Sequence, residues 1–287
     1  MKLVRYDAGN GPELGALDAT GAAIVPLDNV SDTRSMSALL AQGSPGMERI
    51  RAAVQDARQQ IPLAGVRLLA PVGDPQKILC IGQNYRDHCE EQNQPIPERA
   101  ILFAKFANAI NDPGGVIRLH RATTQVDYEA ELAVVIGGAG GGGFAIPEEE
   151  AMQHVAGYMC ANDVSARDIQ LHPAEKQWVR GKTPDGFFPI GPYLVTADEI
   201  PDPHALDISL TLNGEVRQKS NTSNLIFKIP YLISHLSQTM TLVPGDIIST
   251  GTPGGVGMYS NPQVFLRPGD VVSVTISGLG TLTNSVA

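Results

Sequence analysis

The chain has 287 residues, roughly twice the length of a typical domain, so we expect one large domain or one large and one small domain. Hydrophobic residues make up 43% of it and charged residues 18%, which excludes a disordered tail, a coiled coil and a polytopic membrane protein. The net charge of -9 gives no overall attraction to nucleic acid or an anionic bilayer. We therefore expect a globular protein that binds neither nucleic acid nor a membrane.

The three cysteines, Cys80, Cys89 and Cys160, are odd in number and have no Cys-x-x-Cys spacing. They predict neither a disulfide framework nor a thiolate zinc site, and they fit a reducing compartment. The start, MKLVRYDAGNGPELG, lacks the apolar run of a secretory signal. We therefore expect a cytoplasmic protein.

Turn-forming residues are frequent, with 30 Gly and 21 Pro, whereas aromatic residues make up only 5% of the chain. This composition predicts many short strands joined by turns, and so a mixed, β-rich α+β fold. Residues 1–72 form a predicted small N-terminal domain, which ends in a proline-bounded stretch at 69–75. Its expected elements are strands at 2–6, 13–18 and 22–27 and a helical stretch over 36–59.

Residues 73–287 form the predicted larger domain. Two late segments, 242–250 and 266–276, share a Pro-Gly turn followed by Asp and β-branched residues, which predicts a turn feeding a strand each time. Two copies indicate a β-hairpin roll and are too few for a solenoid. The other expected elements are strands at 77–82, 129–136, 157–163, 192–196 and 207–216 and a helix at 224–239.

Acidic residues alternate along the predicted strand that begins at Asp127. Side chains of a strand point alternately to its two faces, so Asp127, Glu129 and Glu131 share a face that continues into apolar Ala133 and Val135. Such a face points toward an interior or a cleft, where neighbouring carboxylates repel one another and lose their hydration. Mg²⁺ or Mn²⁺ would neutralise them, because hard divalent ions prefer carboxylate oxygens.

Asp163 is the candidate for a third ligand, because it lies at the polar end of an otherwise apolar strand. A site of Glu129, Glu131 and Asp163 is thereby predicted for Mg²⁺ or Mn²⁺, and Ca²⁺ would be an equivalent occupant in a crystal. The alternative is an edge strand whose glutamates are solvated, and the spacing alone leaves both open. Histidine clusters suited to zinc are absent from the sequence.

The run Gly138–Gly143 matches the glycine pattern of dinucleotide-binding loops. The phosphate site of such a loop requires its last glycine inside the first helical turn, whereas residues 144–147 intervene here and Pro147 is the expected first helical residue. We therefore interpret the run as a flexible connector.

The segment Cys80–Ala100 begins as a buried strand and then becomes polar and proline-containing, which predicts a mobile lid over Asn84–Ala100. His88 and Glu91 lie three residues apart, so on one helical turn the carboxylate would orient the imidazole as a general base. An exposed helix face with a surface histidine explains the same spacing equally well.

Lys105 and Lys182 lie in apolar or glycine-rich surroundings. Buried lysines there would compensate an anionic substrate beside the carboxylates, although solvated lysines are the commoner case. The segment 250–257, TGTPGGVG, predicts a tight loop that offers amide and hydroxyl donors, for which a plain turn is the alternative.

Seven segments occur in a specific order from about residue 77 to the C-terminus, namely GQNYRDH, FAKFANAI, DYEAELAVVIG, CANDVSARDIQ, RGKTPDGFFPIGP, LNGEVRQ and TGTPGGVG. Together they resemble the fumarylacetoacetate hydrolase family, in particular its bacterial branch of acylpyruvases, oxaloacetate decarboxylases and 2-hydroxyhepta-2,4-diene-1,7-dioate isomerases. The resemblance implies a mixed β-sandwich or roll preceded by a small N-terminal domain. It also implies an enzyme that depends on a divalent metal and forms a homodimer.

The resemblance assigns roles to single residues. It implies that Glu129, Glu131 and Asp163 are metal ligands, that His88 and Glu91 form a lid dyad and that Lys182 is the active-site lysine. It also implies that the substrate is bound by Lys105, Gln170 and Thr252. The reactions of the family leave electrons as an enolate beside a carboxylate, and a divalent ion supplies the charge that stabilises it.

These roles lead to a mechanistic hypothesis for a small anionic 2-oxo acid substrate. The enzyme would hydrolyse a C–C bond in a 2,4-dioxo acid of the acylpyruvate, fumarylpyruvate or 2,4-diketo-3-deoxy sugar acid type. His88, oriented by Glu91, would deprotonate the attacking water. Lys182, Gln170 and Thr252 would bind the developing oxyanion. Decarboxylation of an oxaloacetate-type acid, isomerisation of 2-hydroxyhepta-2,4-diene-1,7-dioate and a metabolite-binding relative without activity are the alternatives.

Overall fold

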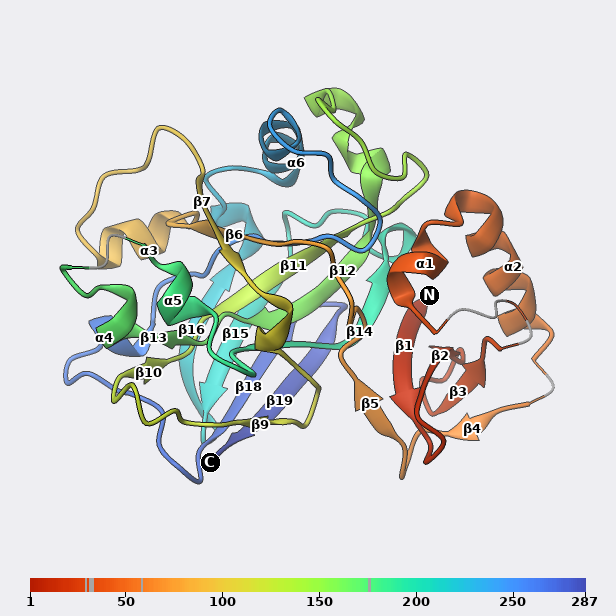
Figure 1. Cartoon of the computed structure of the whole chain (residues 1–287), viewed down its shortest axis with the longest axis horizontal. Coiled ribbons are helices and arrows are strands. Elements are labelled where there is room, and N and C mark those ends of the chain that lie inside the picture. Colours follow the sequence, from red (N-terminus) through yellow and green to blue (C-terminus); the bar gives the residue numbers. More distant parts are fainter. Residues whose placement is uncertain (29, 31–33, 58, 175–176) are drawn as a thin grey trace.

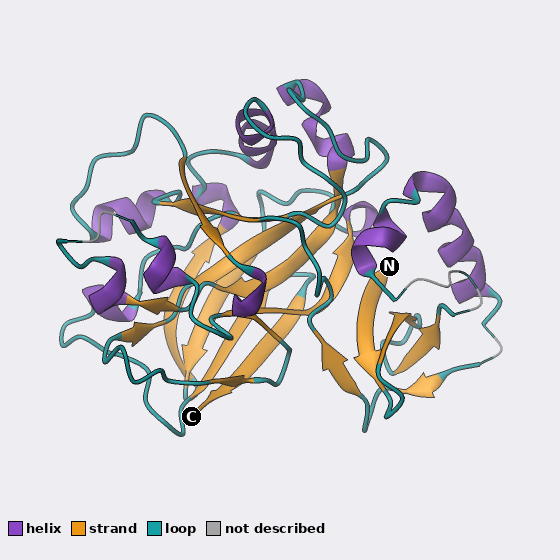
Figure 2. Ribbon diagram, viewed as in Figure 1, coloured by secondary structure: helices purple, strands orange, loops and turns teal. Residues whose placement is uncertain are grey.

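The computed structural model describes the whole chain except residues 29, 31–33, 58, 175 and 176. Within the described residues, the strands form one large sheet, a five-stranded sheet and a two-stranded pair. Figure 1 shows a small N-terminal part, with strands and the helices α1 (Met36–Leu40) and α2 (Gly43–Gln55), beside a larger part that holds most of the other strands. The fold is mixed and β-rich, as predicted (Figure 2).

The large sheet consists of β1 (Lys2–Asp7), β2 (Pro12–Leu17), β3 (Ala23–Pro26), β4 (Ile61–Pro62), β5 (Arg67–Leu69), β6 (Ile78–Gly82), β7 (Ile101–Lys105), β8 (Ile110–Asn111), β11 (Ala130–Ile136), β12 (Val155–Asn162), β14 (Phe188–Thr196) and β17 (Ile247–Ser249). Its strand order is β4-β3-β2-β1-β14-β12-β11-β17-β6-β7, with β5 beside β1 and β8 beside β14. Strand β1 pairs antiparallel with β14, so the sheet continues from the N-terminal part into the larger part.

The five-stranded sheet consists of β9 (Val116–Ile117), β15 (Asp207–Leu212), β16 (Glu215–Asn221), β18 (Val271–Ile276) and β19 (Gly280–Val286), in the order β16-β15-β18-β19-β9. The separate pair is β10 (Val126–Asp127) with β13 (Ser165–Ala166). The second Pro-Gly turn feeds the hairpin β18-β19, as predicted. The first turn feeds β17, which instead pairs with β6 and β11 inside the large sheet. The two copies therefore do not form a hairpin roll together.

The helices are short and lie at the edges of the sheets (Figure 2). The predicted stretch 36–59 is two helices, because Gly43 has a φ of 61° that interrupts the right-handed turn; residue 58 lies outside the described residues. No helix among the described residues is long and apolar enough to cross a membrane. The other helical elements are α3 (Arg86–Glu91), α4 (Arg167–Gln170), α5 (Val179–Lys182), α6 (Ile229–Ser237), η1 (Ala107–Ala109), η2 (Glu148–His154), η3 (Ala197–Glu199), η4 (Thr222–Asn224) and η5 (Gly257–Tyr259).

Strand β11 lies between β12 and β17, and both of its faces are buried. Leu132 and Val134 pack in a core shared with β15, β18 and α6, which fills the space between the two main sheets. Ala133 and Val135 pack on the opposite side, in a core shared with α1 and β6. The predicted alternation of side chains is therefore correct from Glu131 onward. The alternative of an edge strand with solvated glutamates is wrong, because β11 is paired on both sides.

The glycine run after β11 packs against neighbouring backbone. Gly138 N donates to the carbonyl of His154, and Gly143 forms a bridge with Leu242. The 3₁₀ element η2 begins only after Pro147. This arrangement supports the interpretation of the run as a connector.

Replacing Leu132 by Ala should destabilise the protein by about 2–5 kcal/mol, because this fully buried side chain would leave a cavity between the sheets. Denaturant unfolding measures the loss. Leu102→Ala is the matched control, since Leu102 on β7 is 42% exposed, and its cost should stay below about 1 kcal/mol. Equal losses for the two variants would contradict the assignment of this face of β11 to the core.

Candidate active site

Three carboxylates meet where β11 and β12 lie side by side. Ala130 pairs with Asn162, so Glu129 and Asp163 stand at the adjoining ends of the two strands. Asp163 N donates to the Glu129 carbonyl at 2.9 Å, and Glu129 N donates to Asn162 Oδ1 at 3.0 Å. One oxygen each from Glu129, Glu131 and Asp163 lies within 4.8 Å of the others. The fold thus brings together the three acids that the sequence analysis singled out.

Two buried lysines lie against this carboxylate cluster. Lys182 Nζ lies 2.5 Å from Glu129 Oε2 and 2.8 Å from Asp163 Oδ2, and Lys105 Nζ lies 2.5 Å from Asp163 Oδ1. Burial alone would lower the pKa of Lys182, but the two carboxylates outweigh it and the pKa is raised. For Lys105 burial prevails, and its pKa is lowered. Solvated lysines are excluded, since each residue is only 2% exposed.

Glu131 is the member of the cluster that no cation contacts among the described residues. Its Oε2 accepts hydrogen bonds from the Ser249 hydroxyl and, at 3.1 Å, from Gly251 N. Burial and the charges of Asp163 and Glu129 raise its pKa well above the ordinary value. A divalent cation would relieve both effects, and carboxylate oxygens are the donors that Mg²⁺ and Mn²⁺ prefer. The residues present therefore fit such an ion.

Arg167, which the sequence analysis did not identify, adds a third cation. Its guanidinium lies 2.7 Å from Glu129 Oε1 and 2.8 Å from Asp127 Oδ2. Burial alone would raise the pKa of Glu129, but Lys182 and Arg167 hold it well below its ordinary value. Asp127 also accepts hydrogen bonds from Gly257 N and from the next backbone N–H. Asp127 is therefore not a member of the carboxylate cluster, and it connects Arg167 to the loop that follows Thr252.

His88 and Glu91 form the predicted dyad on α3. His88 Nδ1 lies 2.9 Å from Glu91 Oε2, and His88 is only 5% exposed, so the alternative of a surface histidine is wrong. Two residues that the sequence analysis missed complete this arrangement. Gln92 Nε2 donates to His88 Nε2, and Gln83 Nε2 donates to Gln92 Oε1 at 3.1 Å. Both ring nitrogens thus have partners, and these fit a neutral imidazole with its proton on Nδ1.

The predicted lid is docked on the larger part in this structure. Asn84 Nδ2 donates to the Thr250 carbonyl at 2.8 Å, and Glu91 Oε1 accepts from Gly255 N at 2.8 Å. Asp87 accepts from the hydroxyl of Ser220. Helix α3 is therefore held against the loop 250–257. The mobility of the lid stays a prediction.

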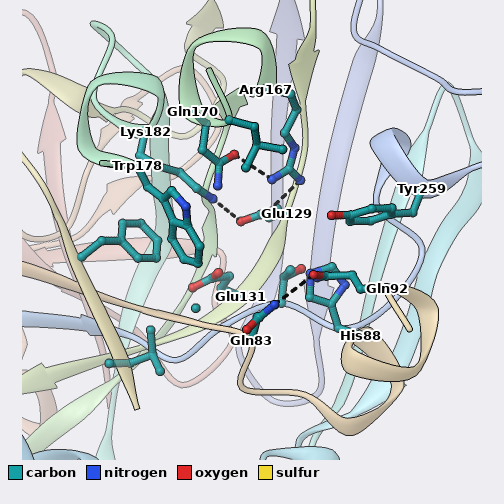
Figure 3. Close-up of a pocket in the computed structure, with 15 residues that line it drawn as sticks. Gln83, His88, Gln92, Glu129, Glu131, Arg167, Gln170, Trp178, Lys182 and Tyr259 are labelled. Atoms are coloured by element: carbon teal, nitrogen blue, oxygen red, sulfur yellow. Dashed lines mark hydrogen bonds and ion pairs between the residues drawn. The ribbon is translucent and has the colours of Figure 1, made fainter. Parts of the chain in front are cut away.

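Many of these groups line one cavity of about 490 Å³, its open mouth included. Figure 3 shows the cationic and amide groups on one side of it and His88 with its glutamine partners on the other. Lys105 and Asp163 are buried behind this lining, so Lys105 contacts Asp163 and does not line the cavity, where the resemblance had placed it as a substrate-binding residue. The lining includes Gln83, His88, Gln92, Glu129, Glu131, Arg167, Gln170, Trp178, Lys182, Thr252 and Tyr259.

Two aromatic residues in the lining had no signal in the sequence. Trp178 packs edge-on against Phe103, with ring centroids 5.5 Å apart. It also covers Gly82, where a Cβ atom would lie 2.4 Å from the indole ring, so only glycine leaves room for it. Tyr259 lies edge-on to His88, with centroids 6.1 Å apart. Their positions depend on tertiary packing, which no local spacing reveals.

A buried acidic cluster facing a His–Glu dyad, in a mixed β fold, defines the class of site. The family model described as fumarylacetoacetate (FAA) hydrolase C-terminal matches residues 77–287, and the model Rv2993c-like, N-terminal, matches residues 1–71. The chain belongs to the fumarylacetoacetate hydrolase family of enzymes, and the resemblance seen in the seven segments is confirmed.

Individual relatives match over the full chain. Oxaloacetate tautomerase FAHD2A, mitochondrial, from Bos taurus is 46% identical over 290 residues, which cover 100% of this chain and 91% of the relative; the Homo sapiens protein of the same name is 44% identical with the same coverage. Among solved structures, fumarylacetoacetate hydrolase from Exiguobacterium antarcticum has a TM-score of 0.88 at 36% identity. Maleylpyruvate hydrolase from Sphingobium sp. SYK-6, in complex with manganese(II) and pyruvate, has a TM-score of 0.81 at 31% identity. Both structural matches cover 100% of this chain and 99% of the other.

The two oxaloacetate tautomerases, which match the whole chain, are named as mitochondrial, and this contradicts the prediction of a cytoplasmic protein. Cys80, Cys89 and Cys160 are free and buried, in agreement with the sequence analysis. Free thiols indicate a reducing environment, but they do not distinguish one reducing compartment from another. The three cysteines and the missing secretory run, on which the cytoplasmic prediction rested, therefore do not separate the cytoplasm from a mitochondrion.

Replacing Asp127 by Asn should destabilise the protein by about 3 kcal/mol, because it removes the charge from a fully buried pair and leaves Arg167 undercompensated. Thermal or denaturant unfolding measures this. The matched control is Asp198→Asn, since Asp198 forms an exposed pair with Arg51 at 3.1 Å and its loss should cost less than about 1 kcal/mol. If the two variants lose the same stability, Asp127 does not have the anchoring role assigned to it.

Proposed function

We propose that this enzyme transfers a proton on a small anionic 2-oxo acid, and that keto–enol tautomerisation of oxaloacetate is its reaction. The observation that carries the proposal is the cavity itself, in which His88 lies across from the donors Lys182 and Gln170 (Figure 3). A base removes a proton beside a carbonyl most readily when donors on the other side stabilise the oxyanion that forms. The names of the relatives at 44–46% identity support this choice of substrate.

We propose that Mg²⁺ or Mn²⁺ is held by Glu129, Glu131 and Asp163. When bound, the ion supplies positive charge that stabilises an enolate. The buried site contains four carboxylates, those of Asp127, Glu129, Glu131 and Asp163, and three cations, Lys105, Lys182 and Arg167. A bound divalent ion would turn this excess of one negative charge into an excess of one positive charge, which favours an anionic substrate. The maleylpyruvate hydrolase structure, which holds manganese(II) and pyruvate, supports the same kind of site here.

The residues that carry out the proton transfer lie on two opposite walls of the cavity. On the lid wall, His88 Nε2 takes the proton from the carbon beside the carbonyl, while Glu91 holds the imidazole through Nδ1. The electron pair of the broken C–H bond forms the C=C bond of an enolate, whose oxygen gains the negative charge; a proton from solvent then converts the enolate to the enol, and His88 returns its proton to solvent. On the opposite wall, the Lys182 ammonium and the Gln170 amide donate to that oxygen. Gln170 presents its NH₂ group because its Oε1 accepts from Arg167 at 3.0 Å.

Hydrolysis of a 2,4-dioxo acid is the second candidate, favoured by the structural neighbours named as hydrolases. It would use the same walls, with His88 activating a water in place of a C–H bond. In this structure Gln92 donates to His88 Nε2, the atom on which that water would be held. Both reactions require Gln92 to leave this nitrogen, which the C–H group of the substrate reaches in tautomerisation and a water reaches in hydrolysis. The names of the relatives at 44–46% identity support tautomerisation as the first candidate.

Mn²⁺ should bind the metal-depleted protein with one ion per chain, and Glu131→Gln should abolish this binding because it removes a carboxylate from the cluster. Ser249→Ala, which removes only a hydrogen bond to Glu131, should weaken it about 10- to 100-fold. Titration calorimetry and the spin-resonance signal of Mn²⁺ measure both. Glu150→Gln, at an exposed position of η2, is the matched control and should bind as the wild type does. Full activity after exhaustive chelation would contradict the proposed metal site.

Replacing His88 by Asn should lower kcat for ketonisation of enol-oxaloacetate by about 10²- to 10⁴-fold while Mn²⁺ affinity stays unchanged, because the base is lost and the carboxylates are not. The enol and keto forms are followed by NMR. His120→Asn, whose imidazole contacts the Asp185 carbonyl outside the lining, is the matched control and should keep full activity.

Incorporation of ¹⁸O from water into the product of an acylpyruvate separates the two candidate functions. Tautomerisation predicts that kcat/KM for oxaloacetate exceeds that for acylpyruvate cleavage. A higher kcat/KM for ¹⁸O-incorporating cleavage would replace the first proposal by the second.

A further inference from the structure

A fully buried glutamine links the carboxylate strand of the active site to the loop 250–257. Gln218 lies on β16, in a segment to which neither function gives a role, and is 0% exposed. Its Oε1 accepts from Ala130 N at 2.8 Å, the residue between the two glutamates of the cluster. Its Nε2 donates to Thr252 Oγ1 and to the Pro253 carbonyl, both at 2.8 Å. The side chain thus spans from the carboxylate strand to the loop 250–257.

The partners of this amide leave only one orientation for it. Ala130 N–H is a donor and requires Oε1, whereas the Pro253 carbonyl is an acceptor and requires Nε2. The second proton of Nε2 therefore points at Thr252 Oγ1, which has to accept it. A hydroxyl that accepts at its oxygen has its own proton directed elsewhere.

Thr252 lines the cavity, and its hydroxyl proton has no acceptor among the described residues of the chain. We propose that Gln218 is a positioning residue that fixes the Thr252 hydroxyl as a hydrogen-bond donor to an oxygen of the substrate. Without Gln218, the hydroxyl would be free to donate to the Pro253 carbonyl or to rotate. The inference rests on the proposed function only in taking the substrate to be an anionic 2-oxo acid.

Gln218→Glu tests this role, because the isosteric acid keeps an acceptor for Ala130 N and replaces the NH₂ group that faces Thr252 and the Pro253 carbonyl. The new carboxylate accepts from the Thr252 hydroxyl and turns its proton away from the cavity. We expect kcat/KM to fall about 10- to 100-fold, the loss expected for one hydrogen bond to a charged group. Mn²⁺ affinity should change by less than about twofold, since the carboxylate strand keeps its anchor. Gln263→Glu, an exposed glutamine bound to the Met258 carbonyl, is the matched control and should have no effect.

The double-mutant cycle with Thr252 separates positioning from a merely structural role. If Gln218 acts through the hydroxyl, Gln218→Glu costs nothing further in a Thr252→Val background and keeps its full cost in a Thr252→Ser background. Additive losses in the Thr252→Val background would overturn the proposal. Gln218→Met, which carries no buried charge, should give the same non-additivity. The proposal can therefore still be tested if the acid variant folds poorly.

Binding of oxalate to the Mn²⁺-loaded protein, measured by calorimetry, gives a readout that needs no turnover. Gln218→Glu and Thr252→Val should each weaken oxalate binding, again without additivity. If oxalate behaves in this way while oxaloacetate is not tautomerised, the positioning role stands and the proposed function fails. If oxalate affinity is unchanged in both variants, the positioning role fails whatever the reaction is.

Discussion

The site depends on keeping several carboxylates ionised although they are buried in the protein. Burying a charge without a partner is costly, and like charges close together add to that cost. Here Lys105, Lys182 and Arg167 are buried with the acids, so most of the negative charge is compensated inside the protein. Glu131 is left with hydrogen bonds alone. The position of a divalent ion is therefore prepared by an imbalance of charge as much as by the geometry of the ligands.

The backbone makes this concentration of charge possible. Strand β11 is paired on both sides and packed on both faces, so Glu131 cannot turn toward solvent. The pairing of Ala130 with Asn162 sets Glu129 beside Asp163, and the Asn162 side chain supports it by accepting a hydrogen bond from Glu129 N. Register, which is fixed by core packing over the whole strand, thus determines the distances between the acids. The hydrophobic cores on the two faces of β11 maintain the active site as directly as its polar groups do.

Sequence patterns identified the groups whose chemistry is local. Alternation along one strand predicted Glu129 and Glu131, a helical turn predicted His88 beside Glu91, and most strands lie within a few residues of their predicted bounds. The partners of these groups were not predicted, because pairing is a property of the tertiary fold. The alternation predicted Asp127 on the same face as the two glutamates, but Asp127 binds Arg167 and a distant loop and not the carboxylate cluster. In the same way, nothing in the spacing of Gln92 or Gln218 shows which side chain each amide reaches.

The two walls of the cavity are held by interactions of different strength. Strand pairing and buried ion pairs fix Glu129, Lys182 and Arg167, so this wall changes little without loss of the fold. Helix α3 is held mainly by hydrogen bonds that Asp87 and Glu91 accept from the loop 250–257 and from β16, which are weaker than the ion pairs of the first wall. Both proposed reactions share the first wall, which stabilises an enolate in either case. The reaction type is therefore decided on the lid, at the nitrogen of His88 that Gln92 occupies.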